Sequence, residues 1–283
     1  MDSLNTKKGD TKKIFRQCGT CSHTFAHILN REFGHPKELE ELALNPLAGG
    51  ILNQGHQCGM IWGAALAVGA ESYRKHKDMD LAVAVAVTAT QHLVESFEKR
   101  SHTVNCKEIV GYSLSNVLGL VRLMLHTTLK GMDNTKCFNL AEDWAPEAIQ
   151  SGTEGLNQEA IEITQKPVSC ASEVVRRMGG TDEEILMVAG FAGGLGLSGN
   201  ACGALSAAIW MKTLHWCREH PGKLPPYFNN KISKKVLKLF NEATESEMLC
   251  EKITGKRFDT INEHSEFINN GGCKELISTL AKS

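Results

Sequence analysis

An internal repeat constrains this chain more than any other feature, because two halves that share one pattern are expected to fold in the same way. The offset between the copies is 144 residues. One segment recurs without a gap: Ala48-Gly49-Gly50, Gly55 and Cys58-Gly59 return as Ala192-Gly193-Gly194, Gly199 and Cys202-Gly203. The same offset takes Cys106 to Cys250, so 48 residues separate the two cysteines within each copy. The structure between them has therefore kept its length.

Further cysteines match outside this segment with a slipped register. Cys21 matches Cys170, five residues out of register, and Cys137 matches Cys273, eight residues out of register. Each copy thus contains four matched cysteines, and Cys18 and Cys217 are left over.

The join between the copies lies in the polar, acidic stretch from Leu140 to Pro167. We place it near Gln150, which gives a first four-cysteine repeat over residues 1–150 and a second over residues 151–283. Charged and apolar residues alternate in a helical way from Asn157 to Gln165, which predicts a short helix inside the join.

The spacing of apolar residues predicts helices throughout the chain. The predicted helices are Cys21–Phe33, Cys58–Lys75, Leu81–Lys99, Leu114–Leu129, Cys170–Met178, Cys202–His220, Ser233–Ala243 and Lys274–Lys282. Residues 82–87 alternate Ala and Val like a strand, but the alanines and the amphipathic continuation favour a helix. No series of strands with hairpin turns is apparent. We therefore predict an all-α fold of two similar helical-bundle repeats related by a pseudo-twofold, with cysteine sites buried among the helices.

Charge and composition exclude several classes of partner. The 31 basic and 32 acidic residues leave no excess charge to attract nucleic acid or an anionic membrane. Ile185–Met211 has no charged residue and is long enough to cross a bilayer, but its glycines and Asn200 would be costly in hydrocarbon. We predict a turn feeding a buried helix there, and no membrane span.

The cysteine content and the first residues indicate a compartment. The polar segment Met1–Asp10 lacks the apolar core of a signal peptide, which favours the cytoplasm. Disulfide frameworks are rare there, so ten cysteines indicate metal binding or redox chemistry more than disulfide bridges.

Cys58 and Cys202 each follow a glycine-rich turn and open a long apolar helix. Unpaired N–H groups at a helix start stabilise negative charge, so we expect a thiolate at both positions. Gly59 and Gly203 would leave space beside the sulfur for a cluster or for another helix. The alternative is that the glycines only permit close packing and the cysteines are small buried apolar residues.

These motifs resemble the C_GCAxxG_C_C family of redox-active proteins, which is named for four cysteines and a C-G-A-x-x-G motif. The second half carries Cys170, then Ala192-Gly193-Gly194 leading to Cys202-Gly203-Ala204-Leu205-Ser206-Ala207, and then Cys250 and Cys273. Met60 replaces the motif alanine in the first half, and Ala207 replaces its last glycine in the second. The resemblance covers nearly all of both halves and implies a redox or metal function without specifying a reaction. It extends to a domain of split-Soret cytochromes, which implies electron transfer by analogy.

The matched cysteines are the candidate ligands. Zinc sites usually draw on close pairs such as C-x-x-C, whereas these cysteines are spaced by 32, 48 and 23 residues in the second half. Dispersed thiolates suit an iron-sulfur cluster, so we assign cluster binding to Cys21, Cys58, Cys106, Cys137, Cys170, Cys202, Cys250 and Cys273. Possible extra ligands are Cys18, Cys217 and His56. The expected partner is a redox protein or a small-molecule substrate, and the chain could form a homo-oligomer.

Two alternatives stay open. The first is a metal-free thiol-disulfide oxidoreductase, which would use Cys18 and Cys21, the closest cysteine pair, or pairs of cysteines from the repeats. Zinc held by the cysteines would instead make a structural protein. The G-x-G-x-x-G match at residues 194–199 lacks a preceding strand, and its first copy has Leu52 in place of Gly196, so a dinucleotide site is not predicted.

Overall fold

The computed structural model describes residues 10–158, 161–227 and 230–283. Residues 1–9, on which the expected compartment rests, and residues 159–160 of the predicted helix Asn157–Gln165 lie outside the described part. The described residues of that stretch beyond Leu156 are not helical, so the predicted short helix is wrong there.

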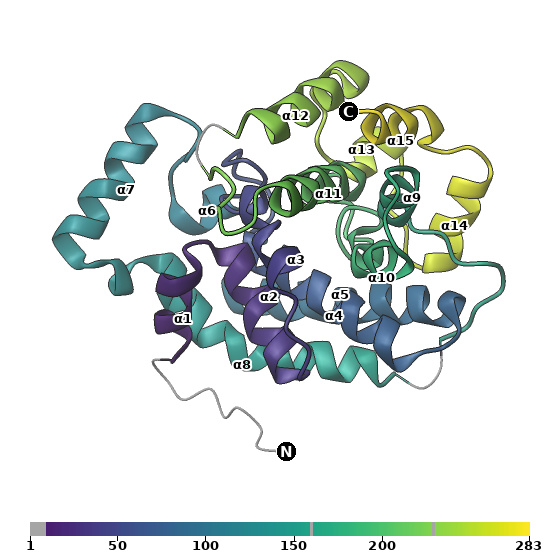
Figure 1. Cartoon of the computed structure of the whole chain (residues 1–283), viewed down its shortest axis with the longest axis horizontal. Coiled ribbons are helices and arrows are strands. Elements are labelled where there is room, and N and C mark those ends of the chain that lie inside the picture. Colours follow the sequence, from purple (N-terminus) through teal and green to yellow (C-terminus); the bar gives the residue numbers. More distant parts are fainter. Residues whose placement is uncertain (1–9, 159–160, 228–229) are drawn as a thin grey trace.

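The described chain is helical, as Figure 1 shows. The first repeat contains α1 (Asp10–Cys18), α2 (Cys21–Glu32), α3 (Glu38–Leu42), η1 (Asn45–Leu47), α4 (Gly59–Lys75), α5 (Met79–Ser101), α6 (Cys106–Val110), α7 (Val117–Lys130), η2 (Met132–Asn134) and α8 (Lys136–Leu156). The second contains α9 (Cys170–Arg177), α10 (Asp182–Met187), η3 (Ala189–Phe191), α11 (Gly203–Glu219), α12 (Lys231–Thr244), α13 (Cys250–Thr254), α14 (Ile261–Asn269) and α15 (Lys274–Ala281). Extended pairing in these ranges is limited to two isolated backbone bridges. The all-α prediction is confirmed, and the pseudo-twofold stays a prediction.

All eight predicted helices are present, including α5, in which Ala and Val alternate. Asp78 caps α5 by accepting from the N–H groups of Asp80 and Leu81, and the alanines favour helix over strand. The predicted polar join from Leu140 is helical as far as Leu156, despite Pro146 inside α8. Its apolar residues recur at helical spacing and are buried, and this packing outweighs the hydrogen bond that proline removes. The join near Gln150, which α8 contains, stays a prediction.

The glycine-rich turns have the same unusual backbone in both copies. Residues 49–53 and residues 193–197 each have five consecutive positive φ angles, from +52° to +83°. A left-handed conformation costs about 1–2 kcal/mol for each residue other than glycine, so the surrounding structure must hold these turns in place. Within the second turn, Gly196 N–H donates to Gly190 O at 2.8 Å and Gly199 N–H donates to Gly193 O at 2.9 Å. The prediction of a turn that feeds a buried helix within Ile185–Met211 is confirmed.

The two repeats share one hydrophobic core. Helix α4 packs against α10 and η3 of the second repeat, while α11 packs against α3 and η1 of the first. Trp62 meets Phe191 edge to face at 4.8 Å between ring centroids, and Trp210 Nε1 donates to Glu40 O at 3.0 Å. The reciprocal packing fixes the position of one set of cysteines relative to the other.

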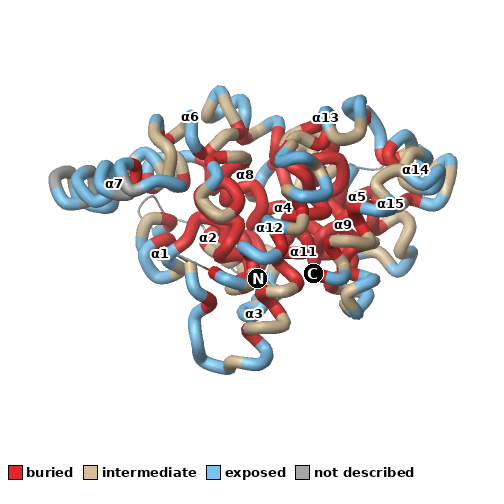
Figure 2. The backbone as a smooth tube through the Cα atoms, turned by 90° about the horizontal axis from the view of Figure 1, so that it is seen from above, coloured by how far each residue is buried: buried red, intermediate tan, exposed pale blue. Residues whose placement is uncertain are grey.

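Helix α7 differs from the other long helices in its surroundings. Figures 1 and 2 show it projecting from one end of the molecule, and its Leu118 and Met124 side chains are 66% and 68% exposed. In Figure 2 the buried backbone is concentrated in the rest of the molecule, around α2, α4, α8 and α11. No helix within the described residues combines the length and the apolar character needed to cross a bilayer.

Candidate functional site

The structure brings four cysteines of the first repeat together. Cys21 begins α2, Cys58 directly precedes α4, Cys106 begins α6, and Cys137 is the second residue of α8. Cys21 and Cys58 are hydrogen-bonded to one another through their side chains, and both lie close enough to Cys106 and Cys137 for the charges of these thiols to interact. We call these residues the first quartet. Four helix starts from distant parts of the repeat therefore deliver four sulfurs to one place.

The second repeat assembles its four cysteines in the same way. Cys170 begins α9, Cys202 directly precedes α11, Cys250 begins α13, and Cys273 directly precedes α15. All four line one small enclosed cavity, and their charges interact mutually. We call these residues the second quartet. The slipped register of its first and last cysteines reflects differences in connection length and leaves the convergence unchanged.

Backbone hydrogen bonds explain why the 48-residue spacing recurs. Cys106 N–H donates to His56 O at 2.7 Å, and Cys58 N–H donates to Val104 O at 2.8 Å. The second repeat has the equivalent bonds, from Cys250 N–H to Asn200 O at 2.6 Å and from Cys202 N–H to Met248 O at 2.9 Å. In each repeat, two backbone hydrogen bonds thus join the segment before the second cysteine to the segment before the third. The helical hairpin between these segments must keep a length that allows both hydrogen bonds to form.

The glycine turns also reach the sulfurs. The backbone of Gly49 is hydrogen-bonded to Cys21, and the backbone of the matched Gly193 is hydrogen-bonded to Cys170. Because a sulfur can only accept from a backbone N–H, these contacts favour the thiolate form. The left-handed turn therefore supplies a hydrogen bond to the first cysteine of each quartet.

A hydrogen bond between two thiols and burial together set the electrostatics of the first quartet. The hydrogen bond from Cys58, with help from backbone N–H groups, holds the pKa of Cys21 below its usual range, although burial opposes this. That same hydrogen bond and burial raise the pKa of Cys58. Burial, with the neighbouring thiols, raises the pKa of Cys106 and raises the pKa of Cys137 to about 12. Cys21 is thus the thiol poised to ionise first.

The second quartet has no thiol with a lowered pKa. Burial raises the pKa of Cys170, Cys202 and Cys250, and it raises the pKa of Cys273 to about 12. The expectation of a favoured thiolate at Cys58 and Cys202 is therefore wrong for the chain by itself. The N–H groups at a helix start stabilise the anion less than burial destabilises it.

Gly59 and Gly203 have different roles, although the sequence presents them as a pair. A Cβ atom at residue 59 would lie 2.6 Å from Cys21 Sγ, whereas a Cβ atom at residue 203 would lie 1.7 Å from Phe191 O. Gly59 therefore makes room for a sulfur of the first quartet, as the sequence predicts. Gly203 instead makes room for the backbone of η3.

The residues around the quartets were not predicted. Tyr112 and Tyr227 lie near the first quartet, because its thiols contribute to raising the pKa of both phenols. Tyr227 comes from the second repeat, and its Oη donates to Asn53 Oδ1 at 2.8 Å. His264 and Phe267 of α14 line the second quartet's cavity. Nothing in the sequence marks Tyr227, whereas His264 precedes Cys273 on an amphipathic segment, which is a signal of a nearby helix face.

The side chains of the three possible extra ligands have neighbours other than the quartet cysteines. Cys18 contacts Thr24 and lies near Glu41 and Arg31, so the C-x-x-C pair has its two sulfurs among different neighbours. Cys217 is buried on α11 near Glu40. His56 lines a separate cavity with Glu247 of the second repeat.

Comparison with known families matches the chain twice. A family model described as "Putative redox-active protein (C_GCAxxG_C_C)" matches residues 19–149 and 168–283. The two matches each contain one quartet, so the resemblance and the tandem duplication predicted from the sequence are confirmed. No curated protein and no solved structure matches the chain.

Proposed function

The chain belongs to the C_GCAxxG_C_C family in both of its halves, and from this premise we propose that each quartet holds an iron-sulfur cluster for electron transfer or for reduction of a small substrate. The observation that carries the proposal is the convergence, in each repeat, of four thiols from four helix starts, of which three are buried and the fourth, Cys137 or Cys273, is partly buried. Iron-sulfur clusters are held by cysteine thiolates, and four of them complete the usual ligand set.

The donor set fits such a cluster in its chemistry. The lining of the second quartet's cavity offers four sulfurs together with apolar groups, Thr254 and His264, and no carboxylate. His264 Nδ1 lies 3.0 Å from Val168 O, and a carbonyl oxygen only accepts, so Nδ1 donates there. Cys170, Cys202, Cys250 and Cys273 would hold one cluster, and Cys21, Cys58, Cys106 and Cys137 the other. A bound cluster would supply one-electron chemistry, while the chain positions it and excludes water.

The surrounding backbone is suited to the negative charge of thiolates. The backbone of Gly49 or Gly193 is hydrogen-bonded to one sulfur in each quartet, and Cys202 is also hydrogen-bonded to the backbone of Ala204 and Leu205 at the start of α11. Hydrogen bonds to the sulfurs and burial are the factors that set a cluster's reduction potential. Because burial keeps most of these thiols protonated, ligation must release protons, and cluster or metal uptake should strengthen as pH rises.

A second candidate is a Zn²⁺ ion in each quartet, and the size of the second cavity favours it. The cavity measures about 10 Å³, which is near the space of one water molecule. A single ion with Zn–S distances of about 2.3 Å requires little rearrangement, whereas a cluster requires the sulfurs and lining side chains to move outward. Since Zn²⁺ has no redox chemistry, that protein would be structural.

Contact between Cys21 and Cys58 supports a third candidate, a metal-free dithiol centre. These two thiols are hydrogen-bonded to one another, and the lowered pKa of Cys21 makes it the nucleophile of the pair. Oxidation would form one S–S bond and release two protons and two electrons to an acceptor disulfide. The Cys18–Cys21 pair, which the sequence favoured for this role, is less suited because the sulfurs have different neighbours.

Anaerobic purification followed by iron, acid-labile sulfide and zinc analysis distinguishes the three candidates. Clusters predict iron and sulfide in equal amounts, with visible absorbance that bleaches on reduction. Zinc without iron would replace the proposal with the structural one, and a colourless, metal-free protein with reversible two-electron thiol titration would replace it with the dithiol centre.

A further inference from the structure

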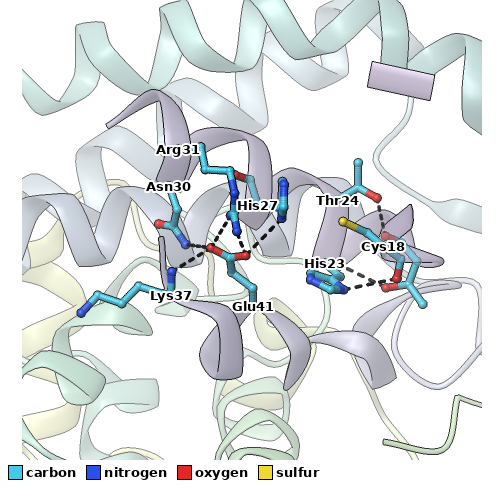
Figure 3. Close-up of polar contacts among 9 residues, drawn as sticks. Cys18, His23, Thr24, His27, Asn30, Arg31, Lys37 and Glu41 are labelled. Atoms are coloured by element: carbon cyan, nitrogen blue, oxygen red, sulfur yellow. Dashed lines mark hydrogen bonds and ion pairs between the residues drawn. The ribbon is translucent and has the colours of Figure 1, made fainter. Parts of the chain in front are cut away.

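A group of one cysteine and two histidines lies outside the quartets. We propose that Cys18, His23 and His27 bind one Zn²⁺ ion beside the first repeat, with the fourth position left to water or another small donor. Figure 3 shows these side chains together with the polar residues that hold them. The proposal is independent of what the quartets hold.

Local structure brings the three donors together. Cys18 is the last residue of α1, and the turn at Gly19 and Thr20 leads directly into α2. His23 and His27 are four residues apart on α2, so they share one face of the helix. One ligand atom from each of the three residues lies within 4.8 Å of the others. All three side chains are partly exposed, which leaves a route for an ion to enter.

Hydrogen bonds leave the metal-binding nitrogen of both histidines available. His23 Nδ1 lies 3.2 Å from Cys18 O. His27 Nδ1 lies 3.4 Å from Glu41 Oε2. A carbonyl oxygen and a carboxylate only accept, so each Nδ1 donates and each Nε2 presents its lone pair. Metal-ligating histidines usually donate their other nitrogen to a carboxylate or a backbone carbonyl in this way.

Glu41 is held rigidly for this role. Its carboxylate is buried, and it accepts from Arg31 Nη1 at 2.9 Å, from Asn30 Nδ2 at 2.9 Å and from Lys37 N–H at 2.9 Å. Held by these contacts, the carboxylate fixes the orientation of His27, whose Nδ1 lies 3.4 Å from Glu41 Oε2.

The donor set points to zinc. One thiolate and two imidazoles are ligands that Zn²⁺ accepts, and three protein ligands with an open fourth position are typical of catalytic zinc sites. The second half has no equivalent of this group. When Cys21 is aligned with Cys170, the three residues align with Pro167, Ser172 and Arg176. The proposed site is therefore a feature of the first half alone.

The test uses the full chain loaded with Zn²⁺ and dialysed. We expect His23→Gln/His27→Gln to retain about one zinc ion per chain fewer than the wild type, with iron and sulfide unchanged. Zinc K-edge absorption of the wild type should show nitrogen at about 2.0–2.1 Å beside sulfur at about 2.3 Å, and this ion by itself contributes two nitrogens and one sulfur. The double variant should lose this nitrogen contribution. Glu41→Gln should weaken zinc affinity about 10–100-fold, and exposed His35→Gln, the matched control, should not.

Equal zinc retention by the wild type and the double variant would overturn the proposal. So would a zinc shell made only of sulfur, because it would place the ion in a quartet. If the double variant does not fold, the number of zinc ions that Cys18→Ala retains per chain tests the proposal in the same way. The wild-type absorption spectrum tests it without any substitution.

Discussion

In the second repeat, α14 lies over the cysteine quartet and adds His264, Phe267 and Ile268 to the lining of its cavity. In the first repeat, α7 occupies the same place in the sequence, between the third and fourth cysteines, but it projects from the molecule. Tyr112 and Tyr227 lie near the first quartet instead. The same arrangement of helix starts thus has different surroundings in the two repeats. Apolar side chains and a histidine lie beside the second quartet, and two tyrosines lie near the first.

The difference teaches that the duplication has preserved the arrangement of the four cysteines and altered what surrounds it. Hydrogen-bond donors and exposure near the sulfurs tune a bound cluster or metal, so the two centres are expected to differ in reactivity although their ligands match. The lowered pKa of Cys21, without a counterpart among the second quartet, is the first sign of this difference.

The largest effect is expected from the matched pair Gly203→Ala and Gly59→Ala. The added methyl at residue 203 meets the Phe191 carbonyl, which belongs to a packed backbone, so we expect unfolding free energy to fall by about 3 kcal/mol. At residue 59 it meets Cys21 Sγ, which can rotate, and more distantly the backbone of Ala48 at 3.0 Å, so we expect a smaller loss of about 2 kcal/mol. Urea unfolding measures both changes. Equal losses would contradict the different roles of the two glycines.

Metal analysis sharpens the same comparison. Gly59→Ala should deplete the first centre because it displaces a ligand, while Gly203→Ala should keep both centres for as long as the protein stays folded. Full metal content in Gly59→Ala would contradict the expected displacement of Cys21 from the first centre.

Acid should destabilise the second repeat through His264. This side chain is buried, and burial lowers its pKa to about 4. The unfolded chain therefore takes up a proton below about pH 6.5, while the folded chain remains neutral until about pH 4. Stability is lost as pH falls through that window, by up to about 3 kcal/mol.

The matched variant is His264→Asn, which keeps a donor for Val168 O but cannot titrate. Its unfolding free energy should fall less than that of the wild type between pH 7 and pH 4, and the difference between the two curves isolates this residue. Parallel curves would mean that His264 is already protonated or accessible to water.

The smallest effect is expected from Tyr227→Phe. The substitution removes the hydrogen bond to Asn53 Oδ1, which is worth about 1 kcal/mol. Because Tyr227 lies near the first quartet, the spectrum or potential of the first centre should shift and that of the second should not. Tyr73→Phe, on a partly buried tyrosine away from both quartets, serves as the control. A shift in both centres would contradict the assignment of Tyr227 to one of them.

The sequence was sufficient to predict the main helices and the grouping of the cysteines. Helix starts at Cys58 and Cys202 could be predicted because a glycine-rich turn precedes an uninterrupted apolar run, and the repeat identified which cysteines belong together. Packing decided what local signals could not: α8 continues through Pro146 because its buried face, with Trp144 between Phe25 and Phe97, stabilises it.

The surroundings of the quartets depend on long-range contacts that no local pattern encodes. Tyr227 reaches the first quartet from the second repeat, and Glu41 reaches His27 from α3. The pKa values of Cys58 and Cys202 also required burial to be known, because the favourable helix start alone predicted the opposite direction. The Cys18, His23 and His27 cluster was within reach of the sequence, since two histidines four residues apart on a predicted helix follow a cysteine.

Iron and sulfide content in three cysteine variants tests most directly whether the two quartets are two separate cluster sites. Cys58→Ser and Cys202→Ser each remove one sulfur from one quartet, and Cys217→Ser removes a buried thiol that belongs to neither. After anaerobic purification, the first two variants should each lose about half of the wild-type iron and sulfide, and the third should lose none. Full iron and sulfide in both quartet variants, or none in the wild type, would contradict the assignment.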